Sequence, residues 1–183
     1  MDSKIFLQKI ALSEDYINKI ARNKNKLYKL FRIPKRNGTY RIINAPNKVL
    51  KGIQRWILEN ILSDFPIHDS AMAYIKNKSI KNNAELHLGK KYIISCDLEE
   101  FYTNIKKIDI IKYFNKYYDI KLVYWISEIC TFSDYLPQGA VTSPTLSNIL
   151  FYDVDDKIAQ YCANHGIVYT RYSDDISISS NNY

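Results

Sequence analysis

The sequence predicts an α+β fold in two parts, and three observations support this prediction. Residues 1–92 carry apolar side chains at helical spacing together with one β-hairpin pattern. Residues 93–183 continue with strand-like and helical patterns in turn. Charge divides at the same place, because residues 1–92 hold 19 Lys and Arg against 7 Asp and Glu, a net +12, whereas residues 93–183 hold 7 against 12, a net −5.

This charge asymmetry suits a protein that holds a phosphate backbone with its basic part and gathers cations with its acidic part. A basic surface can also simply confer solubility, so both explanations stay open on charge alone. The chain has 183 residues, of which 46% are apolar, and is therefore long enough to bury a core.

Several classes of protein are excluded by composition. No apolar run approaches the roughly 18 residues of a membrane span, and the N-terminus lacks a cleavable apolar segment, so we expect a cytoplasmic protein with no membrane partner. Cys96, Cys130 and Cys162 are widely spaced and form neither a disulfide framework nor a zinc pattern with the histidines. We expect these thiols to be reduced and mostly buried.

The basic part is predicted to form helices and one hairpin. Apolar spacing predicts helices over residues 5–11 and 16–30, with Ser13 before the second. Two strands are predicted to flank residues 36–38, where the Asn-Gly pair supplies the positive φ angles of a tight turn. An amphipathic helix is predicted over residues 48–62.

The acidic part begins with a strand that ends in a carboxylate. Residues 92–96 form a β-branched, largely apolar run, predicted to be a buried strand, and Asp97 follows directly. Helices are predicted near residues 106–118 and 121–132. A third helix is predicted to begin at residues 143–144, where serine can cap it and proline can occupy its first turn.

A second hairpin follows these helices. Residues 167–172 and 176–179 alternate like its two strands and leave Ser173, Asp174 and Asp175 at the tip. A strand, an acid, helices and then a hairpin with paired acids is the order of elements expected of a polymerase palm.

This order also fits the chemistry of nucleotidyl transfer. Two Mg²⁺ ions about 4 Å apart can activate the attacking hydroxyl and stabilise the leaving pyrophosphate. Mg²⁺ prefers oxygen ligands and keeps several waters, so two or three aspartates suffice when phosphates complete its shell. Asp97, Asp174 and Asp175 fit this requirement. A lone Asp-Asp pair is far more often a turn or surface feature, so the pair carries weight only beside other motifs.

Three long motifs, CDLEEFY, LPQGAVTSPTLSN and YTRYSDDISIS, together resemble reverse transcriptases. The segment RIINAPNKVLKGIQRWIL is similar to the fingers of bacterial retron reverse transcriptases, and NAELH, from Asn83 to His87, is similar to a signature of that group. The resemblance implies a polymerase right-hand fold, with helical and β-hairpin fingers over residues 1–92 and an RRM-like antiparallel palm over residues 93–183. Because the sequence ends at Tyr183, the thumb is expected to be absent, and the chain to be either a fragment or completed by a partner.

The resemblance also implies a metal site. Asp97, Asp174 and Asp175 would be catalytic and would hold two Mg²⁺ ions, with the backbone carbonyl of Leu98 as a further ligand. Tyr172 would begin the Tyr-x-Asp-Asp turn of the family.

Further residues are implied to contact the incoming nucleotide. Tyr102 matches the bulky position that excludes a ribose 2′-hydroxyl, and a packed aromatic is the alternative. Gln138 and Gly139 match a loop that lines the nucleotide pocket, where glycine permits close backbone approach and glutamine can orient the substrate. A simple turn is the alternative.

Cations of the first hairpin are implied to contact the triphosphate. Arg41, accompanied by Lys35 and Arg36, matches fingers residues that donate to phosphate oxygens. Solvated hairpin cations are the alternative interpretation.

Two other groups of polar residues have weaker signals. Asn83 and His87 are expected to bind RNA through the signature motif, although a lone histidine is more often a satisfied structural residue. Asp153, Asp155 and Asp156 look like a metal cluster in one dimension, but a helix turns them in different directions. We expect these three acids on a solvated helix face.

The sequence thus supports two functional hypotheses. The first is an RNA-directed DNA polymerase of retron type, which copies a structured noncoding RNA that serves as template and primer. Its partners would be deoxynucleoside triphosphates, an RNA–DNA hybrid and a retron effector protein, and its role would be antiphage defence. The second is a truncated module that binds RNA or a partner protein without extending a primer. The intact set of three aspartates favours the first hypothesis.

Overall fold

The computed structural model describes residues 1–35 and 38–182, which form two compact units. The first unit comprises Met1–Asp64 and Tyr102–Ser147, and the second comprises Phe65–Phe101 and Asn148–Tyr183. Each unit therefore combines segments from both halves of the sequence. This division by packing is distinct from the predicted boundary between fingers and palm at residues 92 and 93, which stays a prediction.

Helices form most of the first unit. They are α1 (Ser3–Ile10), α2 (Glu14–Asn23), α3 (Lys48–Asn60), α6 (Lys107–Phe114) and α7 (Ile120–Ile129). Their core includes the ring of Phe6, whose centroid lies 5.3 Å from that of Trp56 and 5.7 Å from that of Trp125. Helix α7 packs against α1, α2 and α3 and so covers their apolar faces, and α6 packs in turn against α7.

The predicted helix over residues 16–30 is wrong at its C-terminal end. Helix α2 stops at Asn23, a short 3₁₀ helix spans Lys24–Leu27, and strand β1 (Tyr28–Pro34) begins directly afterwards. The first residues of β1 include apolar side chains at positions that also fit the helical spacing of α2. The spacing alone therefore did not show where the helix ends and the strand begins.

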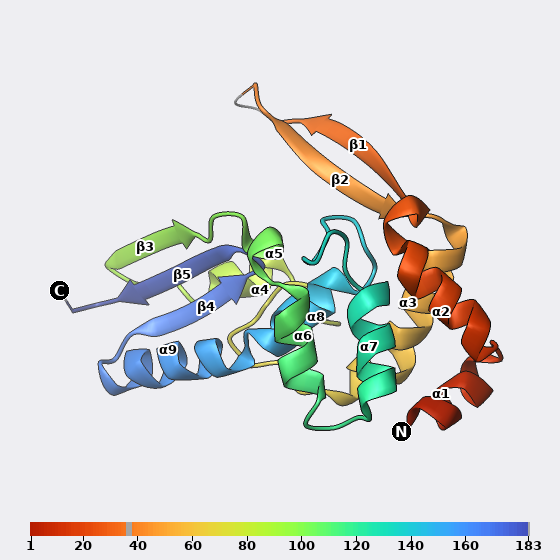
Figure 1. Ribbon diagram of the computed structural model, residues 1–183. Helices are drawn as coiled ribbons and strands as arrows, with labels where there is room; N and C mark the ends of the chain where they lie inside the picture. Colours follow the sequence, from red (N-terminus) through yellow and green to blue (C-terminus); the bar gives the residue numbers. More distant parts are fainter. Residues whose placement is uncertain (36–37, 183) are drawn as a thin grey trace. The chain divides into compact units, whose positions relative to one another are not determined.

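Strand β1 pairs antiparallel with β2 (Tyr40–Pro46), from Tyr28 opposite Pro46 to Pro34 opposite Tyr40. This confirms the two strands of the predicted basic hairpin. The hairpin extends away from the helices of its own unit (Figure 1). Gly38 has a φ of +80°, as a tight turn requires, whereas Arg36 and Asn37 lie outside the described residues.

The second unit contains a three-stranded antiparallel sheet. Its strands are β3 (Tyr92–Asp97), β4 (Val168–Tyr172) and β5 (Asp175–Ser180), in the order β3-β5-β4. Helix α9 (Tyr152–Asn164) packs against β4, as does the shorter α4 (Ile80–Glu85). Figure 1 shows α9 running alongside β4.

Two helices contain residues of both units, because the chain passes from one unit to the other within them. They are α5 (Phe101–Asn104), which follows the segment after β3, and α8 (Ser143–Leu150), which begins where the sequence predicted. A short 3₁₀ helix, Leu62–Asp64, ends the N-terminal segment of the first unit. No described helix is long and apolar enough to cross a membrane.

Strand β3 forms where predicted, but the expectation that it is buried is wrong. All its residues are exposed, including Ile93 at 57% and Ile94 at 60%. The reason is its position, because β3 pairs only with β5 among the described strands and α9 packs on β4 at the other edge. As expected, the cysteines are unpaired, and Cys130 and Cys162 are buried while Cys96 is exposed.

Candidate active site

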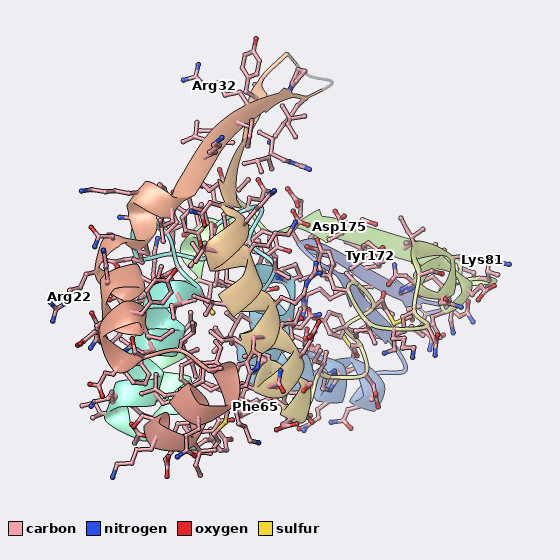
Figure 2. All side chains as sticks on the ribbon, turned by 90° about the vertical axis from the view of Figure 1, so that its right-hand side faces the viewer. Arg22, Arg32, Phe65, Lys81, Tyr172 and Asp175 are labelled. Atoms are coloured by element: carbon pink, nitrogen blue, oxygen red, sulfur yellow. The ribbon has the colours of Figure 1, made fainter. Side chains whose placement is uncertain are left out.

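The register of the sheet brings two acidic residues opposite one another at one end of the second unit, and a third acid lies in the adjoining turn. Asp97 lies opposite Asp175, and Asp175 lies opposite Tyr172 on its other side. Residues directly opposite one another in antiparallel strands point to the same face, so the side chains of Asp97, Asp175 and Tyr172 form one row across the sheet. Asp174 precedes Asp175 in the turn. Figure 2 shows Tyr172 and Asp175 at this end of the sheet.

Backbone contacts connect the two stretches of chain that carry the acids. The Leu98 N–H donates to the carbonyl of Asp174 at 2.9 Å. Ser173, in the turn, has a φ of +64°, and its Oγ lies 3.3 Å from the hydroxyl of Tyr74. The chain after β3 is thereby joined to the turn between β4 and β5, which places the Leu98 peptide next to the acids.

The acids influence one another electrostatically. Burial, followed by the negative charges of Asp174 and Asp97, raises the pKa of Asp175 above its ordinary value. Carboxylate oxygens from neighbouring strands are the donor set that Mg²⁺ prefers, and a divalent cation would relieve their mutual repulsion. The chemistry of these donor atoms therefore fits such an ion. Within residues 1–35 and 38–182, no three Asp, Glu, His or Cys side chains form a group that could hold a metal ion.

His87 packs on the same face of the sheet as the acidic row. Its Nδ1 lies 2.6 Å from Ser179 Oγ and its Nε2 lies 2.8 Å from Thr170 Oγ1, and the side chain is buried. Burial, and then the charge of Lys90, lowers the pKa of His87, so the imidazole is neutral at neutral pH.

The structure therefore favours the packing alternative for His87 over the predicted RNA contact, because hydroxyls of the sheet engage both ring nitrogens. Asn83, from the same motif, is half-buried, and its Oδ1 has no hydrogen-bond partner among the described residues. An RNA contact through Asn83 remains a prediction.

The expected solvated face of α9 is wrong for one of its three acids. Asp153 is exposed and Asp156 is half-buried, but Asp155 is fully buried and pairs with buried Arg171 at 2.7 Å. Helix α9 directs Asp155 toward β4, so the carboxylate of Asp155 pairs with the guanidinium of Arg171 and is shielded from water. Sequence reasoning missed Arg171, although a cation one residue before the Tyr-x-Asp-Asp turn was visible.

In the first unit, the predicted nucleotide loop packs against β2. The Asn44 N–H donates to the carbonyl of Gln138 at 2.8 Å. Gly139 has a φ of +118°, and a Cβ there would lie 2.8 Å from Ile43 Cγ2 and 2.9 Å from the Asn44 carbonyl oxygen. Glycine at position 139 therefore lets the loop backbone approach β2 closely. A contact of Gln138 and Gly139 with a nucleotide remains a prediction.

Strand β2 also carries Arg41, whose side chain is exposed, three residues before Asn44. Lys35 is exposed as well, while Arg36 lies outside the described residues. Tyr102 is half-buried in α5, and its carbonyl accepts from Ile105 N–H at 3.2 Å. The first unit contains Arg41, Lys35 and Tyr102, whereas the second contains the three acids.

Comparison with known proteins supplies the family. A family model described as "Reverse transcriptase (RNA-dependent DNA polymerase)" matches residues 33–183. The chain belongs to the reverse transcriptase family. Its curated relatives include retron reverse transcriptases, as the sequence motifs predicted, and the chain spans about half of the length of the first of them.

Three relatives illustrate the similarity. The Retron Ec73 reverse transcriptase of Escherichia coli is 38% identical over 164 residues, which cover 81% of this chain and 52% of the relative. The Retron Ec86 reverse transcriptase of Escherichia coli is 32% identical over 156 residues, covering 84% and 49%. The Retron Mx162 reverse transcriptase of Myxococcus xanthus is 28% identical over 171 residues, covering 83% and 35%.

Solved structures confirm the fold class. Telomerase from Candida albicans in complex with a TWJ fragment of telomeric RNA aligns with a TM-score of 0.55 at 13% identity, covering 92% of this chain and 42% of that one. Apo telomerase from Candida tropicalis gives 0.54 at 14% identity, covering 98% and 44%. This reverse transcriptase chain therefore has the predicted fingers and palm architecture with antiparallel sheets. No thumb element is evident within residues 1–35 and 38–182.

Gly139 provides a test of the packing between the loop and β2. We expect Gly139→Ala to lower the free energy of unfolding by about 1–3 kcal/mol, because its Cβ would overlap Ile43 and Asn44. Gly52→Ala in α3 is the matched control, since a Cβ there meets nothing within 4 Å. It should raise stability by about 0.5–1 kcal/mol. Urea denaturation measures both, and an equal effect of the two substitutions would contradict the tight contact.

Proposed function

We propose that this reverse transcriptase is an RNA-directed DNA polymerase of retron type that uses two Mg²⁺ ions. The observation that supports the proposal is the cross-strand pairing of Asp97 with Asp175, with Asp174 adjacent in the turn. A shared cluster of carboxylates at a strand end can bind divalent ions where a triphosphate arrives.

The residues of the second unit would hold the ions. Asp97, Asp174 and Asp175 would supply carboxylate oxygens, and Leu98 would supply its backbone carbonyl. Bound Mg²⁺ would activate the attacking hydroxyl and stabilise the charge of the leaving pyrophosphate. The contact between Leu98 N–H and the Asp174 carbonyl keeps these donors close together before any ion binds.

The residues of the first unit would bind and select the nucleotide. Arg41, assisted by Lys35 and Arg36, would donate to the triphosphate, because a guanidinium can contact two phosphate oxygens at once. The Gln138–Gly139 loop would line the nucleotide pocket, and Tyr102 would exclude the ribose 2′-hydroxyl. The loop and Arg41 are both attached to β2, which supports a shared role.

The substrates follow from the family and from charge. The template and primer would be a structured noncoding RNA, extended with deoxynucleoside triphosphates into an RNA–DNA hybrid. The net charge of +12 on residues 1–92 supports binding of a phosphate backbone. We further propose a cytoplasmic location, a retron effector protein as partner and a role in antiphage defence, since the matched relatives are retron enzymes.

A non-catalytic binding module is the second candidate function, and one observation favours it. Strand β3 carries Tyr92, Ile93 and Ile94 on exposed positions, at the end of the strand opposite from Asp97. Exposed apolar surface of this kind is typical of an interface with another protein segment. Primer extension on an RNA template separates the two candidates, because only the polymerase incorporates deoxynucleotides.

The acidic side chains should be essential for DNA synthesis. Asp97→Asn or Asp174→Asn should lower primer extension by the full-length protein by about 100-fold or more, because each amide lacks the anionic oxygen that Mg²⁺ needs. Circular dichroism should show an unchanged fold. Asp153→Asn is the control, since this acid is exposed on α9. Near-normal extension by either variant would remove that acid from the active site.

Arg41 should act on the nucleotide rather than on the template. Arg41→Ala should raise the KM for deoxynucleotides by about tenfold or more, the effect of losing a charge-assisted hydrogen bond. Arg32→Ala is the matched control, because Arg32 is paired with Ile42 and so lies on the opposite face of the hairpin from Arg41. A loss of RNA affinity with an unchanged KM would instead make Arg41 a template contact.

Tyr102 should govern the choice of sugar. Tyr102→Val should leave deoxynucleotide extension measurable and increase ribonucleotide incorporation, because removal of the ring makes room for a 2′-hydroxyl. Tyr102→Phe should keep the discrimination, since the ring remains. Single-turnover extension with each nucleotide measures the ratio. If an active valine variant still rejects ribonucleotides, the tyrosine serves only in packing.

A further inference from the structure

A buried guanidinium lies next to the turn that carries the paired acids. Arg171 of β4 and Asp155 of α9 are both fully buried and make a two-point contact, Nη2 to Oδ2 at 2.7 Å and Nε to Oδ1 at 2.9 Å. Tyr169 donates its hydroxyl to the same carboxylate at 2.7 Å. Nη2 also donates to Oδ1 of Asn148 at 3.2 Å. The charge of the guanidinium is therefore balanced inside the second unit.

The other terminal nitrogen of Arg171 contacts the turn itself. Nη1 donates to the carbonyl of Ser173 at 2.9 Å. The φ of +64° at Ser173 is unfavourable for a residue with a side chain, so surrounding contacts must maintain it. Arg171 is in turn fixed by its backbone, because its N–H donates to Ser70 O and its carbonyl accepts from Met72 N–H, each at 2.8 Å.

The same guanidinium contacts the segment that follows Asp97. Its Cζ lies 5.7 Å from the ring centroid of Phe101 and 4.7 Å from that of Phe151, within the range of cation–π attraction. Phe101 comes four residues after Asp97. Arg171 thus touches both stretches of chain that carry the three acids.

Stability alone does not account for this arrangement. Burial of an ion pair carries a large desolvation cost, and well-packed apolar side chains of similar volume are often as stable or more stable. An apolar side chain, however, has no donor for the Ser173 carbonyl. The contact that distinguishes arginine from an apolar residue is therefore the contact with the turn.

We propose that Arg171 is a positioning residue for the polymerase reaction. Its hydrogen bond to Ser173 and its contact with Phe101 keep the turn that carries Asp174 and Asp175 next to the segment that follows Asp97. The effect on catalysis rests on the proposed function, whereas the effect on the turn does not.

The test compares two variants of the full-length protein. Arg171→Met combined with Asp155→Leu removes both charges and leaves no unpaired ion in the core. Tyr169→Phe is the matched control, because it removes one hydrogen bond to Asp155 and none to the turn. Two quantities are measured: the hydrogen-exchange rate of the Leu98 amide, which reports its bond to the turn, and the single-turnover rate of primer extension as a function of Mg²⁺ concentration.

In a folded double variant we expect the Leu98 amide to exchange about tenfold faster or more, since its protection depends on the turn. Primer extension should fall by about 10- to 100-fold and need more Mg²⁺, because small misplacements of reacting groups have effects of this size. Tyr169→Phe should change neither quantity by more than about twofold. Unchanged values in the double variant, or equal effects in the control, would overturn the proposal.

Arg171→Lys covers the case in which the double variant does not fold. Lysine keeps a charge facing Asp155 but lacks the planar fork that reaches Ser173 as well, so the same two changes are expected and their absence overturns the proposal. In the unmodified protein, a Leu98 amide that exchanges as fast as an exposed loop amide would also overturn it. Absence of primer extension in the unmodified protein contradicts the proposed function instead, because the amide measurement does not depend on it.

Discussion

The antiparallel register of β5 between β3 and β4 is the constraint on which the second unit depends. It aligns Asp97, Asp175 and Tyr172 in one row, because directly opposite side chains share a face. Alternation along β4 places Arg171 on the other face, where it meets Asp155 of α9. A slip of one residue would send the acids and the guanidinium to the wrong faces. The strand register therefore places the candidate metal ligands on one face of the sheet and the buried Arg171–Asp155 ion pair on the other.

The acidic side chains on the two sides of this sheet have different electrostatic environments. On one face, the carboxylates repel one another, and their proximity contributes to the raised pKa of Asp175. On the other, the carboxylate of Asp155 is engaged by Arg171 and Tyr169. An acid already bound by a guanidinium and a phenol is a poor ligand for a cation, whereas a row of like charges near water favours one. The sequence separated the acids of α9 from the candidate metal ligands, but it did not predict that Asp155 would be buried against Arg171.

Sequence periodicity predicted the strands and the positions of the acids because these depend on local patterns. The alternation after residue 167 and the Asp-Asp pair fixed the second hairpin, and the Asn-Gly pair fixed the first. Burial was harder to predict, because it depends on which elements cover a surface: β3 is apolar yet exposed, and Asp155 is charged yet buried. For the same reason the motif containing His87 did not reveal that Thr170 and Ser179, distant in sequence, would engage its ring.

The central claim is that Asp97, Asp174 and Asp175 together bind the ions that support nucleotidyl transfer. The most direct measurement is anomalous diffraction from crystals of the full-length protein with an RNA–DNA hybrid, a non-hydrolysable deoxynucleotide and Mn²⁺ in place of Mg²⁺. The account predicts manganese peaks within about 2–2.5 Å of oxygens from these aspartates, the usual range for hard divalent cations. Manganese bound only at other residues, with the hybrid and nucleotide in place, would contradict it.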